Sequence, residues 1–217
     1  MPTITAIQTG RPKRLDRDGD PWTSAIFKEP VSGPILLRRA NLEGDEQADL
    51  RVHGGPDKAV CVYSGDHYPV WREHFPRMQP GAFGENFTVA DCTEATVCIG
   101  DIYQAGDAMV QVSQPRQPCW KLGRKWDAEE LPALVAKSGR TGWYFRVLTE
   151  GSVAAGDPLL LTKRLYPTLT LTRLNIAMYV RGEDTPWNDL KELAACPELS
   201  RSWRDAFTRR LGAGYTL

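Results

Sequence analysis

The sequence predicts a mainly β protein with some helix, in which a β-barrel over residues 1–165 precedes a small three-helix domain over residues 166–217. In the first part, short alternating or β-branched runs are separated at close intervals by turns rich in Gly and Pro, which is typical of a β-barrel. From Thr168 onward the apolar residues instead recur three and four positions apart, as they do along one face of a helix.

The individual elements follow from the same patterns. We expect strands at 3–8, 23–28, 35–39, 59–63, 110–113, 141–148 and 159–162. Residues 9–21 are polar and contain Gly and Pro, so they predict a solvated loop. Two segments within the barrel region predict helices, 66–75 and 127–137, the second capped by Asp127 and ended by Gly139.

The C-terminal region carries its own helix signals. Thr185 followed by Pro186 is typical of an N-cap and a first-turn proline, and Ser200 is a second N-cap candidate. After Ser200, an apolar residue recurs every fourth position, at Trp203 and Phe207 for example, so we expect this helix to pack one face against its neighbours.

The composition excludes several classes of protein. Lys and Arg total 27 and Asp and Glu total 27, so bulk charge gives no reason to expect a nucleic-acid partner. The N-terminus has no signal-peptide pattern and no apolar run approaches the length of a membrane span, so we expect a cytoplasmic protein without a membrane partner. The five cysteines include no Cys-x-x-Cys pair, which favours reduced thiols over zinc ribbons or iron–sulfur clusters.

The most informative stretch surrounds Cys119. An alternating strand is interrupted by Pro115, and Cys119 then stands where the strand leaves the sheet and a short helix begins. Arg116 lies three residues earlier, and a nearby cation stabilises the thiolate, which is the nucleophilic and metal-binding form of cysteine. The alternative is an unremarkable loop cysteine with solvated basic neighbours.

A second candidate site is the turn at Gly54 and Gly55. Glycine allows a backbone to approach a ligand closely, and successive N–H groups in such a turn can bind an anion. Arg51, His53 and Lys58 flank this turn. The alternative is a structural turn with incidental charges.

Two further polar side chains are candidates with structural alternatives. Asn86 either offers its amide to a ligand or hydrogen-bonds its own turn. The spacing of His67 and His74 matches no standard zinc pattern.

Several separated motifs, in this order, resemble one family. They are LEGDEQ at 42–47, VHGGPD at 52–57, GAFGEN at 81–86, SQPRQPC at 113–119 and TGW at 141–143. Together they resemble MOSC-domain proteins, named after the C-terminal domain of molybdenum-cofactor sulfurase, and within them the YiiM-type subgroup. The resemblance covers nearly the whole chain, and its C-terminal part is similar to the three-helix domain of that subgroup.

The resemblance implies a MOSC-type β-barrel that binds a molybdenum–pterin cofactor (molybdopterin), with Cys119 as the protein ligand to molybdenum. It implies a molybdenum-dependent oxidoreductase that reduces N-hydroxylated compounds, such as the base 6-N-hydroxylaminopurine, to amines, which is a detoxifying activity.

The residues are compatible with this implication. A soft thiolate is a sensible molybdenum ligand. The Gly54–Gly55 backbone with Arg51, His53 and Arg116 suits the cofactor's anion, and Asn86 is a further cofactor-binding candidate. Beside Cys119, His53 and His67 are the catalytic candidates because oxygen removal also consumes protons.

The partners follow from what the chain lacks. It has no flavin motif and no iron–sulfur ligand set, so we expect an external electron-donor reductase. The helical region is also a possible homodimer contact.

Two other functions remain open from the sequence. One is a non-catalytic carrier of molybdenum cofactor or of cysteine-bound sulfur. The other is an interaction protein whose helical tail binds a partner, although such a tail more often packs on its own domain.

Overall fold

The computed structural model describes residues 1–17, 19–181, 184 and 186–214, so the expected cap at Thr185 lies outside the described residues. The strands are β1 (Thr3–Thr9), β2 (Lys13–Arg17), β3 (Asp20–Ser24), β4 (Glu29–Pro30), β5 (Ile35–Leu37), β6 (Val60–Ser64), β7 (Phe87–Ala90), β8 (Ile102–Ala105), β9 (Ala108–Pro115), β10 (Trp143–Thr149), β11 (Gly151–Val153) and β12 (Leu159–Lys163). The α-helices are α1 (Tyr68–Arg72), α2 (Trp120–Trp126), α3 (Leu131–Ser138), α4 (Leu171–Tyr179), α5 (Trp187–Ala194) and α6 (Arg201–Gly214).

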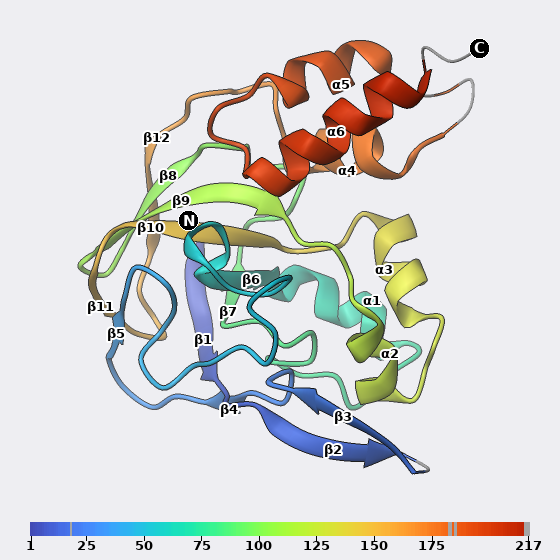
Figure 1. Cartoon of the computed structure of the whole chain (residues 1–217). Coiled ribbons are helices and arrows are strands. Elements are labelled where there is room, and N and C mark those ends of the chain that lie inside the picture. The colour runs from blue at the N-terminus through green and yellow to red at the C-terminus, as the bar shows by residue number, and fades with distance from the viewer. Residues whose placement is uncertain (18, 182–183, 185, 215–217) are drawn as a thin grey trace.

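The main sheet curls into a barrel. Within the described part of the chain its eight strands run in the order β12-β8-β9-β10-β6-β7-β1-β4, mostly antiparallel, with β6 and β7 parallel. Backbone hydrogen bonds join β1 to the segment entering β12, from Ile4 N to Asp157 O at 2.9 Å and from Leu159 N to Pro2 O at 2.8 Å. The two sides of the sheet therefore meet at this end, which confirms the mainly β fold (Figure 1).

Strand alternation divides the barrel wall into an inner and an outer face. On β10, Trp143 and Phe145 point into the core while Tyr144 points outward. On β6, Val60 and Val62 are core residues and Cys61 lies on the outer face. The predicted alternation of 110–113 is confirmed, since Val110 and Val112 are both fully buried in the same core.

The three C-terminal helices pack on one end of the barrel, beside β8 and β9 (Figure 1). Their buried residues, Leu174 and Trp203 among them, belong to the same apolar cluster as the barrel interior. Ser200 caps α6 through its hydroxyl, as predicted, and its backbone N–H donates to Ser113 O on β9 at 2.9 Å. The helical region therefore shares its core with the barrel, as expected of a packed domain.

Two local predictions were wrong. The expected loop at 9–21 contains the hairpin of β2 and β3, in which Leu15 pairs with Trp22 across the strands. The hairpin has too few apolar residues for its alternation to show. Asp127 does not start a helix: it adopts a left-handed φ of 52° at the end of α2, and α3 begins only at Leu131, while Gly139 ends α3 as predicted.

Two other predicted elements end earlier in the structure than the sequence pattern suggested. The expected strand at 23–28 ends at Ser24, and the expected helix at 66–75 is a short 3₁₀ turn followed by α1. None of the helices in the described part of the chain has the length and apolarity that a membrane span requires.

Candidate functional site

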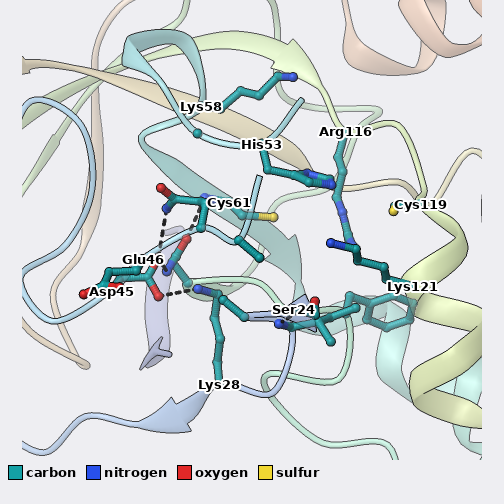
Figure 2. Close-up of a pocket in the computed structure, with 18 of the residues that line it drawn as sticks. Ser24, Lys28, Asp45, Glu46, His53, Lys58, Cys61, Arg116, Cys119 and Lys121 are labelled. Atoms are coloured by element: carbon teal, nitrogen blue, oxygen red, sulfur yellow. Dashed lines mark hydrogen bonds and ion pairs between the residues drawn. The ribbon is translucent and has the colours of Figure 1, made fainter. Parts of the chain in front are cut away.

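A cleft lies against the outer face of the barrel wall, where Cys61 of β6 and Tyr144 of β10 form its base. Including the space that opens to solvent at its mouth, it encloses about 650 Å³. The loop that carries His53 and the segment after β3 close it on two sides, and residues following β9 close it on a third. The side chains from these segments converge on one space in Figure 2.

Positive charge gathers on this cleft. Its basic side chains come from three separate segments and are Lys28, His53, Lys58, Arg116 and Lys121. The ammonium of Lys58 donates a hydrogen bond to the carbonyl of Val52 at 2.7 Å, and that of Lys121 donates one to the carbonyl of Thr23 at 2.9 Å. Because carbonyls are neutral, these bonds orient the lysines without cancelling their charge.

Arg116 is the most unusual of these cations. Only 7% of the residue is exposed, yet among the described residues its guanidinium has no hydrogen-bond or ion-pair partner. Arginine does not lose its proton in proteins, so a mostly buried charge stands here without a direct ion-pair partner, and the Glu85 carboxylate acts on it only at longer range. The nitrogen atoms face the cleft, so an anionic ligand there would supply the missing partner (Figure 2).

The position of Arg116 depends on the TGW motif. The backbone N–H of Arg116 donates to Gly142 O at 2.9 Å, and Gly142 N donates to the buried carboxylate of Glu94 at 2.6 Å. Gly142 has a φ of 72°, and a Cβ there would stand 2.3 Å from Val62 O. Only glycine therefore allows this approach to β6, from which the chain presents Arg116 to the cleft.

A buried ion pair also lines the cleft. The carboxylate of Asp45 is fully buried and accepts hydrogen bonds from Lys28, from Gly10 N at 2.8 Å and from Asn86 Nδ2 at 3.0 Å. Asn86 also donates to Gln8 O at 3.1 Å and accepts from Cys61 N at 3.0 Å. The amide of Asn86 lines the cleft but is engaged on both sides, so it holds this part of the cleft together.

Two thiols face the cleft, and they differ in environment. Cys61 is buried, and desolvation raises the pKa of its thiol, which keeps it protonated. Cys119 is partly exposed and immediately precedes α2, as the sequence predicted. Figure 2 places the Cys119 sulfur at the side of the cleft, next to Arg116 and Lys121. Cys119 is therefore the accessible thiol among the cations.

The electrostatics of the cleft act on His53. Burial, followed by the charges of Lys121 and Arg116, lowers the pKa of its imidazole to about 4. His53 is therefore neutral at physiological pH in the free protein. An anion bound among these cations would raise that pKa and allow the imidazole to hold a proton.

This shift predicts a measurable pH dependence. NMR titration should show one imidazole with a pKa of about 4, and the signal should disappear in His53→Gln. Since the unfolded value is about 6.5, the unfolded chain binds more protons between those values, so stability should fall as pH drops from about 6.5 to 4. His53→Gln should flatten this part of the curve. A His53 pKa near 6.5 in the free protein would contradict the prediction.

The structure brings together most of the residues that the sequence predicted. His53, Gly54, Asn86, Arg116 and Cys119 all line the cleft.

Three predicted residues lie elsewhere. Arg51 points to solvent and pairs with Asp49 at 2.8 Å, and Gly55 does not reach the cleft. His67 is buried and does not line the cleft, and its Nε2 lies 2.7 Å from the Glu94 carboxylate. His67 therefore contacts the site only indirectly, since Glu94 holds Gly142, which in turn holds Arg116.

Sequence reasoning missed several residues of the cleft. Lys28, Asp45, Cys61 and Tyr144 line the cleft and were not predicted as site residues. For Tyr144 a signal existed, because alternation from Trp143 places it on the outer face. Asp45 lies within the LEGDEQ motif, which was a signal, whereas Lys28 gave none because its pairing with Asp45 depends on the path of the intervening loop.

The fold and the cleft define a class: a β-barrel with a cationic cleft and an accessible thiol, capped by three helices. Residues 49–160 match the family described as MOSC domain, and residues 169–214 match the one described as YiiM-like, 3-alpha helix domain. The chain belongs to the MOSC-domain family, with the YiiM-type helical domain that the sequence motifs predicted.

Individual relatives agree with this assignment. The chain is 43% identical to the uncharacterized protein YflK of Bacillus subtilis, covering 96% of this chain and 94% of that protein. The crystal structure of YiiM from Geobacillus stearothermophilus superposes with a TM-score of 0.81 at 40% identity, over 97% of this chain and 100% of the other. A protein of Gibberella moniliformis named "Reductase" is 36% identical over 89% of this chain, which spans only 35% of its length.

The residues present fit the cofactor associated with MOSC domains. The unpartnered guanidinium of Arg116 and the uncancelled lysine charges suit an anionic group such as a phosphate. The accessible thiol of Cys119 suits a soft metal at the side of the same cleft.

Proposed function

We propose that this protein is a molybdenum-cofactor-dependent reductase of N-hydroxylated compounds. The observation that carries the proposal is the buried, unpartnered Arg116 beside the accessible Cys119 in one cleft. The relative named "Reductase" supports reductive chemistry, and the MOSC family supports the cofactor. The reaction is R–NHOH + 2e⁻ + 2H⁺ → R–NH₂ + H₂O, so two electrons and two protons enter for each oxygen removed.

Different residues of the cleft would bind different parts of the cofactor. Arg116, Lys58 and Lys121 would hold the anionic part of the cofactor, and Cys119 would ligate the metal. When bound, the cofactor supplies the two-electron oxygen-atom chemistry that side chains lack. His53, drawn toward protonation by the anion, would hold a proton beside it. We propose that the electrons come from a separate reductase protein.

The decisive test compares the two thiols of the cleft. Molybdenum per chain is measured by elemental mass spectrometry in the wild type, Cys119→Ala and Cys61→Ala, all purified from a host that makes the cofactor. We expect near-stoichiometric metal in the wild type and in Cys61→Ala, and a loss of at least about tenfold in Cys119→Ala, because ligand loss removes a metal bond. Reduction of 6-N-hydroxylaminopurine with a chemical electron donor should follow the metal.

Other outcomes separate the alternatives. Equal metal in Cys119→Ala and wild type would show that this thiol is not the ligand. Bound cofactor without turnover of any N-hydroxylated compound would favour the carrier function. Metal lost only in Cys61→Ala would transfer the ligand role to the buried thiol.

A further inference from the structure

The three-helix domain is hydrogen-bonded to the barrel on both sides of Arg116. On one side lies the end of β9, where the backbone N–H of Ser200, directly before α6, donates to Ser113 O at 2.9 Å. The Ser202 hydroxyl of α6 also donates to Gln114 Oε1 at 3.4 Å. The helical domain therefore holds the end of β9 just before the chain reaches Arg116.

On the other side lies the loop that enters β10, and α4 holds this loop through Asn175. The Nδ2 of Asn175 donates to Gly139 O at 3.1 Å and to Thr141 Oγ1 at 2.9 Å. The Thr141 hydroxyl donates in turn to Gly142 O at 3.0 Å, and the same carbonyl accepts the N–H of Arg116 at 2.9 Å. Asn175 is therefore linked through Thr141 to the carbonyl that holds the Arg116 backbone.

Helix α4 reaches the same glycine by a second route. The backbone N–H of Thr172, in the first turn of α4, donates to Glu94 O at 2.9 Å, and the Glu94 carboxylate accepts the N–H of Gly142 at 2.6 Å. Both backbone polar groups of Gly142 are thus held by residues that α4 contacts directly. While α4 is packed on the barrel, Gly142 has little freedom to move, and neither has the backbone of Arg116.

Asn175 is a costly residue for a helix that only packs. It is 3% exposed, its neighbours Leu174 and Met178 belong to the apolar core, and no described residue is a partner of its Oδ1. Asparagine is a weak helix former, and a buried amide without all of its hydrogen bonds lowers stability. An apolar side chain would suit the packing of α4 better, so the bonds from Nδ2 to the loop explain the residue.

We propose that Asn175 is a positioning residue for Arg116, and that the three-helix domain thereby holds the anion-binding guanidinium of the cleft in place. Packing of the domain orders Arg116 before a ligand arrives, so less ordering is left for binding to impose. By linkage, an anion bound to Arg116 stabilises the packed α4 to the same degree. This inference deepens the proposed function, since it rests on Arg116 as the anion-binding cation, but it requires neither molybdenum nor reduction.

The test measures the Kd for inorganic phosphate by calorimetry, with the full-length protein purified from a host that does not make the cofactor. Asn175→Leu removes the bonds from Nδ2 and fills the space with an apolar side chain. It should raise the Kd for phosphate by about 5- to 150-fold, the usual range for coupling between two sites. In an Arg116→Met background the same change should alter the Kd by less than about twofold, because Asn175 acts through Arg116.

The matched control is Leu174→Ala, the neighbouring core residue of α4. It should lower the urea midpoint by leaving a cavity but leave the Kd for phosphate unchanged, because the bonds of Asn175 stay in place. If Asn175→Leu does not fold, Thr141→Val removes the same link from the barrel side while keeping the side-chain shape, and it should raise the Kd in the same way.

The outcomes separate this role from simple packing and from the proposed function. An unchanged Kd in Asn175→Leu, or an equal rise with and without Arg116→Met, would overturn the positioning role. Phosphate binding that is absent from the wild type, or that Arg116→Met leaves unaffected, would overturn it as well. If phosphate binding responds as expected but no N-hydroxylated compound is reduced, the positioning role is supported and only the proposed function fails.

Discussion

Arg116→Met is expected to make the cofactor-free protein more stable and, at the same time, to weaken binding of the proposed molybdenum cofactor. The guanidinium is mostly buried and no described residue forms an ion pair with it, so an apolar side chain of similar length should raise the free energy of unfolding by about 1–4 kcal/mol, the range found when buried ion pairs are replaced by apolar residues of similar volume. Each hydrogen bond from a charged group to the cofactor contributes about 1.5–3 kcal/mol, so cofactor affinity should fall by about 10- to 150-fold.

Urea unfolding of the cofactor-free protein and molybdenum content of the protein as purified measure the two effects. The matched control is Arg146→Met on β10, because Arg146 is paired with Asp57 at 2.7 Å and bonds Gln111 at 3.1 Å. That control should lower stability and leave molybdenum content unchanged. A destabilised Arg116→Met with normal metal content would show that Arg116 has a structural partner and no ligand role.

Asp45→Ala should produce the largest loss of stability of any single change at the cleft. It removes the counter-charge of Lys28, whose side chain is only 7% exposed, and leaves the N–H groups of Gly10 and Asn86 without an acceptor. Breaking a buried ion pair by removing one partner costs about 3–5 kcal/mol because the other charge stays buried. Glu46→Ala, which removes only an exposed partner of Arg11, should cost at most about 1 kcal/mol.

The double variant Asp45→Ala/Lys28→Met separates the stability contributed by the Lys28–Asp45 ion pair from that of the other hydrogen bonds to Asp45. Removing the stranded ammonium should recover part of the loss, giving a coupling energy between the two sites of about 0.5–3 kcal/mol in a double-mutant cycle. Additive effects of the two changes would show that Lys28 and Asp45 do not depend on each other in solution. The free energies of unfolding are measured by urea denaturation, in which a shift of the midpoint without a change in the m-value reports a change in stability.

Much of the fold was predictable because it depends on local patterns. The alternation of Val110 and Val112 predicted their place in the core, and the helical spacing after Thr168 predicted the C-terminal helices. The β2–β3 hairpin was missed because its strands carry few apolar residues. The boundary at Asp127 was missed because a cap residue for one helix can equally end another.

The sequence alone determined which residues are candidates for the site, since Arg116, Cys119 and His53 stand in short motifs that can be recognised along the chain. Only the tertiary structure decided their environment. The isolation of Arg116, the pairing of Lys28 with Asp45 and the position of His67 behind Glu94 all join segments distant in sequence. Whether a side chain is buried, and which group it pairs with, depend on where the barrel brings those segments together. That is a property of tertiary packing, which no local sequence pattern contains.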